Sequence, residues 1–85
     1  MVYSSNNDVE GENKLIDLEM LREDLIKELQ SINQYQEHID SIDNEEAIYV
    51  LEHIRDEEKE HVAQLIKVIQ KLDTTQAQLF AKEGL

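Results

Sequence analysis

The sequence contains no cysteine and no proline, and it has only two glycines, Gly11 and Gly84, among its 85 residues. The lack of cysteine excludes disulfides and thiolate metal sites. The lack of proline leaves nothing between the two glycines that would break a helix by backbone chemistry alone. A domain this short buries a limited core and usually needs a further source of stability. With disulfides excluded, a metal ion or a partner chain remains.

Basic residues are also few, with 8 Lys and Arg against 20 Asp and Glu and a net charge of −12. Such a chain is repelled by phosphate backbones and anionic membranes, so we expect neither nucleic acid nor a membrane as a partner. Cations are attracted instead. No apolar run approaches the roughly 18 residues of a transmembrane helix, and the N-terminus lacks a signal-peptide pattern. These features predict a soluble, cytoplasmic protein that is not secreted.

The chain divides into a polar N-terminal segment and a helical region. Residues 1–13 are mostly polar and predict a flexible tail. Residues 14–85 predict one helical hairpin domain. From Leu15 to Ile42, apolar residues recur at alternating steps of three and four, which predicts one long amphipathic helix.

A second helix is expected after a short polar break. Asp43, followed three residues later by Glu46, is typical of a capping box at a helix start. The apolar pattern then continues to Leu72, and a connection this short makes the two helices antiparallel neighbours. Residues 76–82 predict a short third helix before Gly84.

The pattern predicts an all-α fold, an antiparallel two-helix hairpin with a short C-terminal helix. Each long helix has one apolar seam, and a lone hairpin leaves these seams exposed. Two hairpins packed face to face form a ferritin-like four-helix bundle that buries them. The heptad-like spacing suits the shallow crossing angle of such bundles, so we expect a homodimer.

Three ionisable side chains stand where the periodicity requires apolar ones. Glu28 interrupts the first seam, Glu58 interrupts the second, and His61 follows Glu58 by three residues on the same helix face. A carboxylate buried in a seam without a partner is strongly destabilising or becomes neutral. A divalent cation removes this problem, and carboxylates with one imidazole per metal suit iron or manganese.

The three residues are half of a known ligand set. Di-iron carboxylate bundles take one Glu from each of two helices and a Glu-x-x-His pair from each of the other two. This chain has one Glu28 and one Glu58-x-x-His61 pair, and a two-fold dimer supplies the second half. The sequence therefore predicts Glu28, Glu58 and His61 as ligands of a di-iron centre, two irons per dimer.

Two other functions fit the same residues. The run from Arg55 to His61 is also typical of a solvated charged face, in which case the chain is a non-catalytic acidic helical interaction module. A rubrerythrin-like di-iron peroxidase is the second alternative, although the lack of cysteine removes a rubredoxin-type iron site. Tyr35, one heptad after Glu28, fits either an ordinary core position or a hydrogen bond to a ligand carboxylate.

Residues 28–73 resemble the encapsulated ferritins, the small ferritin-like proteins carried as cargo by encapsulin nanocompartments. The resemblance is carried by the run Arg55 to His61, by the spacing from Glu28 to Tyr35, and by the spacing from His61 to Asp73. It implies a ferroxidase centre between two chains and dimers arranged in a ring. It also implies an encapsulin shell protein as partner, with the chain inside a cytoplasmic nanocompartment that stores the ferric product.

On the matching positions, the resemblance implies Glu28, Glu58 and His61 as the iron ligands, with Tyr35 near the centre. The sequence also departs from the family. Further acidic residues are common there beside the first-helix ligand, where this chain has Lys27 and Gln30. An aromatic residue is common before the tyrosine, where this chain has Gln34. These departures concern the route by which iron reaches the centre. The C-terminal targeting extension of encapsulin cargo is not recognisable before Leu85.

Overall fold

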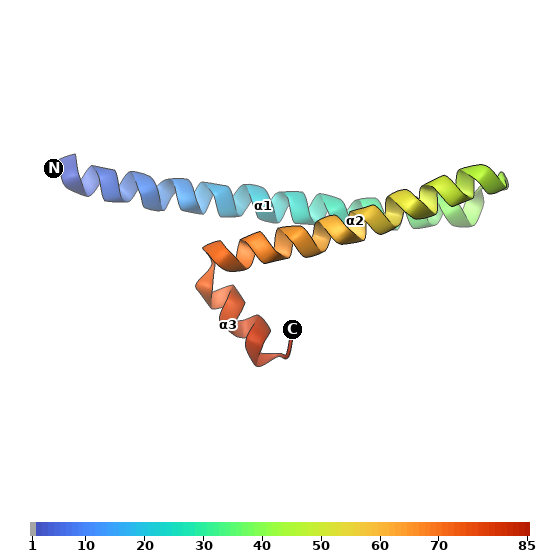
Figure 1. The fold of residues 1–85 in the computed structure, drawn as a ribbon. Coiled ribbons are helices and arrows are strands. Elements are labelled where there is room, and N and C mark those ends of the chain that lie inside the picture. Colours follow the sequence, from blue (N-terminus) through green and yellow to red (C-terminus); the bar gives the residue numbers. More distant parts are fainter. Residues whose placement is uncertain (1) are drawn as a thin grey trace.

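The structure is a computed structural model that describes the backbone of residues 2–85 and the side chains of residues 13 and 15–85. The described residues form three helices in the order α1 (Val2–Ser41), α2 (Glu45–Leu72) and α3 (Thr74–Lys82). Helices α1 and α2 lie side by side as a hairpin, and α3 turns away from it (Figure 1). The predicted all-α hairpin with a short C-terminal helix is confirmed.

Helix α1 is longer than the sequence pattern indicated. Residues 2–13 continue the helix, whereas a polar tail was predicted because this segment lacks apolar periodicity. No proline interrupts the segment, and a glycine at position 11 costs a helix only about 1 kcal/mol relative to alanine. This part of α1 extends beyond the end of α2 (Figure 1). Met1 lies outside the described residues, and the division into tail and hairpin domain stays a prediction.

The start of α2 is set by a different residue from the one that the capping-box pattern indicated. Asn44, not Asp43, is the N-cap, and its side-chain oxygen accepts a hydrogen bond from the backbone N–H of Ala47 at 2.8 Å. This bond satisfies one of the unpaired N–H groups of the first turn. Glu45 and Glu46 occupy that turn, where their negative charge interacts favourably with the positive end of the helix dipole.

Asp73 forms the junction between α2 and α3. Its backbone N–H donates to the carbonyl of Ile69 at 2.8 Å, and its Oδ1 accepts from the N–H of Gln76 at 3.0 Å as the N-cap of α3. Its Oδ2 accepts from Arg22 of α1 at 2.7 Å. The hydrogen bond from Gln76, reinforced by the Arg22 guanidinium, lowers the pKa of the Asp73 carboxyl below its usual value. One carboxylate thus joins α1 to the corner at which α3 begins.

We expect Asp73→Asn to lower the urea midpoint of unfolding at neutral pH. Because folding lowers the pKa of this carboxyl, its contribution is fully present above the unfolded pKa of about 3.9 and is lost as the pH falls through the folded value. The difference from the wild type should therefore shrink as the pH falls below about 4. Urea unfolding followed by circular dichroism measures it, with the exposed Asp17→Asn as control. A difference independent of pH would contradict the assignment.

The seam between α1 and α2 leaves much apolar surface uncovered. Leu18 and Ile69 are buried, with 6% and 4% of their surface exposed, while most other seam residues are half-buried. The accessible surface is 6742 Å², whereas a compact monomer of this mass exposes about 5,200 Å². The exposed apolar side chains include Leu15, Ile26, Leu29, Ile42 and Val68. None of the described helices combines the length and apolar character that a membrane span requires.

Candidate metal centre

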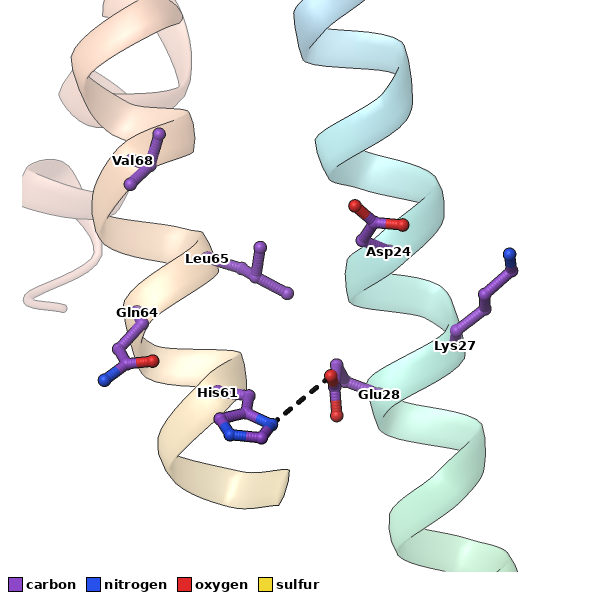
Figure 2. Close-up of a pocket in the computed structure, with 7 residues that line it drawn as sticks. All are labelled: Asp24, Lys27, Glu28, His61, Gln64, Leu65 and Val68. Atoms are coloured by element: carbon purple, nitrogen blue, oxygen red, sulfur yellow. Dashed lines mark ion pairs between the residues drawn. The ribbon is translucent and has the colours of Figure 1, made fainter. Parts of the chain in front are cut away.

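Glu28, Glu58 and His61 come together between α1 and α2. Each offers one ligand atom, and these three atoms lie within 4.8 Å of one another. The Nδ1 atom of His61 lies 3.4 Å from Oε1 of Glu28 and 3.8 Å from Oε2 of Glu58. Figure 2 shows His61 reaching from α2 toward Glu28 on α1. The structure thus brings together the three residues that the sequence predicted as ligands.

The three side chains differ in exposure, and this corrects one expectation. Glu58 and Glu28 lie in the seam, with 17% and 24% of the side chain exposed, but 46% of His61 is exposed. The heptad row of His61 runs along the flank of α2, where Val68 is also 41% exposed. The ligand set therefore opens to one side of the hairpin.

One oxygen of the cluster has no partner. Glu28 Oε2 is buried, and it forms no hydrogen bond in the described part of the chain. Buried polar atoms nearly always have a hydrogen-bond partner or a bound ion. This oxygen therefore indicates a site for a hydrogen-bond donor or a cation. A cation held by Glu28, Glu58 and His61 would satisfy it and would neutralise two neighbouring carboxylates. Carboxylate oxygens with one imidazole nitrogen fit a first-row divalent metal such as iron.

A cavity of about 370 Å³ between the two long helices adjoins Glu28 and His61 (Figure 2). Glu28 and His61 lie at one end of its wall, and Leu65 and Val68 lie farther along α2. The remaining lining residues are Asp24, Lys27 and Gln64. Because His61 and Val68 are partly exposed, solvent can reach Glu28 and His61 through this cavity.

Tyr35 lies outside the cluster. It is half-buried, lies seven residues after Glu28 on α1, and does not line the cavity. Among the described residues, none forms a hydrogen bond with its hydroxyl, so its role beside a ligand stays a prediction. His53 differs from His61 in its surroundings. Its side chain is 73% exposed, and its Nε2 lies 3.5 Å from Oε1 of Glu57.

Arg55 belongs to a charged run in the sequence, and in the structure it connects the two long helices. Its side chain is only 17% exposed, and Nη1 donates to Oε1 of Gln36 on α1 at 2.8 Å. Nε donates to Oδ1 of the neighbouring Asp56 at 3.1 Å. The bond from Arg55 to Gln36 joins the two helices one turn before Glu58. The three-residue spacing from Arg55 to Glu58, which puts both on one helix face, was the available sequence signal.

Comparison with known proteins identifies the family. The EncFtn-like family matches residues 3–83, nearly the whole chain. The chain belongs to the EncFtn-like family. The predicted membership of the encapsulated ferritin group is thereby confirmed. No solved structure matches this EncFtn-like chain.

Two curated relatives come from Myxococcus xanthus (strain DK1622). Encapsulin nanocompartment cargo protein EncC is 43% identical over 75 residues, which cover 85% of this EncFtn-like chain and 57% of that protein. Encapsulin nanocompartment cargo protein EncB is 35% identical over 68 residues, which cover 80% of this chain and 43% of that protein. The chain spans about half the length of the curated relatives it matches.

Proposed function

We propose that this chain is a ferroxidase, which oxidises Fe(II) to Fe(III) at a di-iron centre shared between two copies of itself. The observation that carries the proposal is the convergence of two carboxylates and one imidazole, from two helices, within 4.8 Å. The unpartnered oxygen of Glu28 supports it, because a bound cation would satisfy that atom. The EncFtn-like match supports it at the level of the family.

A second copy is part of the proposal because one hairpin offers only half of a di-iron ligand set. The ligands open to the flank where Val68 is exposed, and Ile42, in the heptad row of Glu28, is 38% exposed. A two-fold axis beside this flank would bring a second set against the first. Covering the apolar side chains on either side of the ligands would favour association. The arrangement of such dimers in a ring stays a prediction.

The three ligands take different roles in this proposal. Glu58, the least exposed, bridges the two ions, Glu28 binds one of them, and His61 supplies the nitrogen. The Nδ1 atom of His61 faces both carboxylates. To bind iron through this atom, the neutral imidazole would carry its ring proton on Nε2. The ferrous ions are the substrate. A pair of them releases two electrons, which with two protons reduce dioxygen to hydrogen peroxide, or hydrogen peroxide to water.

We further propose that the chain works with an encapsulin shell, in iron storage or detoxification inside a cytoplasmic nanocompartment. The support is the naming of both relatives from Myxococcus xanthus as encapsulin nanocompartment cargo. In this arrangement the shell stores the ferric product, and the hairpin supplies only the site of oxidation.

The direct test is to mix the protein with Fe(II) without oxygen and then to add dioxygen or peroxide. The appearance of Fe(III) is followed by absorbance, and oxygen consumption by an electrode. A rate well above that of Fe(II) alone in the same buffer is expected. A rate equal to the protein-free one with both oxidants would contradict the proposal.

We expect His61→Ala to weaken the binding of Zn(II), a redox-silent substitute for Fe(II), by about ten-fold or more. The reason is the loss of the nitrogen ligand from a set of three. Isothermal titration calorimetry measures the affinity, and His53→Ala is the matched control because His53 pairs only with Glu57 among the described residues. An affinity unchanged in His61→Ala but reduced in His53→Ala would move the metal site to the surface of α2.

A further inference from the structure

The candidate centre is divided between two helices, so its geometry depends on how α1 and α2 are held against each other. Glu28 lies on α1, whereas Glu58 and His61 lie on α2. Counted along the helices, Glu28 and Glu58 each lie about 20 Å from the turn that joins them. At this distance, a change of about 3° in the crossing angle shifts one carboxylate against the other by about 1 Å. The turn alone therefore does not fix the geometry of the three ligands.

One hydrogen bond connects the two helices between the turn and the centre. Nη1 of Arg55 on α2 donates to Oε1 of Gln36 on α1 at 2.8 Å, and this bond is partly buried. In the described part of the chain, no other hydrogen bond connects a side chain of α1 with one of α2. The rest of the seam is mostly apolar, and apolar contacts have no preferred direction. Outside the centre itself, the bond from Arg55 to Gln36 is thus the directional contact between the helices.

Both partners of this bond are held by a second contact on their own helix. Nε2 of Gln36 donates to Oδ1 of Asp40 at 3.0 Å, which leaves the amide oxygen to face Arg55. Nε of Arg55 donates to Oδ1 of Asp56 at 3.1 Å. Side chains lean toward the N-terminus of their own helix, and Gln36 lies nearer to the turn than Arg55 does. In this antiparallel pair the two side chains therefore lean toward each other.

Arg55 lies close to the centre, on the side away from its opening. Arg55 precedes Glu58 by three residues and His61 follows it by three, so the two lie about 60° to either side of Glu58 around α2. Neither Arg55 nor Gln36 belongs to the ligand cluster or lines the cavity beside it. The bond is therefore separate from the flank that is proposed to meet a second copy.

We propose that Arg55 and Gln36 are positioning residues for the centre, because their hydrogen bond holds α1 and α2 at the distance and angle at which the three ligands meet. This inference rests on the proposed function. Arg55 lies about 4.5 Å along α2 from Glu58, so a shift at the bond is a shift at the centre. A metal site requires ligands held within about 0.5 Å of the productive geometry. Without the bond, all three ligands are present but too loosely placed.

A positioning role and a merely stabilising role give different results. A bond that only stabilises the hairpin changes the free energy of unfolding, while the folded protein still offers the same ligand geometry. A bond that positions the ligands changes the surroundings of the ion in the folded protein. The absorption bands of Co(II) report these surroundings, because they depend on the number and arrangement of the ligands.

The test uses the full chain with Co(II) under nitrogen. Titration gives Kd, and the absorption bands of the saturated protein report the geometry. Arg55→Met and Gln36→Met each remove one partner, and each is expected to weaken Kd by about ten-fold and to shift the bands. Because both act through one bond, the double variant should resemble either single variant. Gln36→Glu keeps an acceptor for Arg55 and should stay near the wild type.

Lys59→Met is the control, because it removes a positive charge beside Glu58 without removing a contact between the helices. Lys59 is exposed and pairs only with Asp56 of its own helix, at 3.9 Å, among the described residues. Its Kd and bands should match those of the wild type. Circular dichroism on each sample shows that the compared proteins are equally helical. If Arg55→Met does not fold, the comparison of Gln36→Met with Gln36→Glu decides in the same way.

Wild-type bands and Kd in both Arg55→Met and Gln36→Met would overturn this inference and leave the ferroxidase proposal standing. A loss in Arg55→Met alone would overturn it as well, because Arg55 would then act through its charge and not through Gln36. The proposed centre has its own check in the same assay. If Glu58→Gln binds Co(II) as tightly as the wild type, the centre is wrong, and the inference falls with it.

Discussion

Glu58→Ala is expected to lower the rate of Fe(II) oxidation by about a hundred-fold or more, with nearly unchanged helical content. Glu58 is the least exposed of the three ligands, and the proposal gives it the bridging position between both ions. Each dimer would lose two bridging carboxylates at once. The helix itself should tolerate the change, since alanine has the highest helix propensity and the lost carboxylate lies beside another one.

Glu60→Ala is the control for this substitution. Glu60 is exposed, lies on the same helix two residues later, and does not belong to the ligand cluster. It removes the same charge and should leave the oxidation rate near that of the wild type. Ferrous oxidation followed by absorbance, with circular dichroism on the same samples, measures both effects. A Glu58→Ala protein that oxidises Fe(II) at the wild-type rate would refute the assignment of Glu58.

The second large effect concerns assembly, which should depend on metal. Two copies carry twice the net charge of −12, or −24, and this opposes association. The proposed dimer would also place Glu28 and Glu58 of both copies in one cluster, where like charges repel or take up protons. A cation that binds only the dimer stabilises it by mass action. At a free concentration of 100 times Kd, this amounts to about 2.7 kcal/mol per site, or about a hundred-fold in the association constant.

We therefore expect Fe(II) or Zn(II) to shift the wild type toward dimers or larger species, and a chelator to shift it back. Glu58→Gln should reduce the response, because an amide keeps the shape of the side chain but binds metal poorly. Analytical ultracentrifugation with chelator, and then with metal, measures the distribution. If the wild type gives the same species in both conditions, the shared centre loses its physical support.

The three residues of the candidate centre could be found from the sequence because each breaks a regular pattern. Glu28 and Glu58 stand in apolar rows, and charged residues in such rows require a partner. The exposure of His61 could not be found in the same way. A heptad row is a fixed spacing in the sequence, but it drifts around a straight helix, so its position relative to α1 depends on how the helices cross.

The start of α1 and the N-cap of α2 could not be predicted, because local sequence signals compete there. Residues 2–13 lack an apolar face, but a helix can continue without one when no residue breaks it. Asp43 and Asn44 are both good N-cap residues, and the choice between them depends on backbone geometry that spacing does not specify.

The most direct test of the central claim is anomalous diffraction at the iron absorption edge, from crystals grown with Fe(II) under nitrogen. The proposal predicts two iron peaks for each pair of chains, on the two-fold axis or symmetric about it, bonded to Glu28, Glu58 and His61. Both copies should contribute ligands to the pair. Iron bound within a single chain, or at exposed groups such as His53 and Glu57 with the predicted ligands empty, would contradict it.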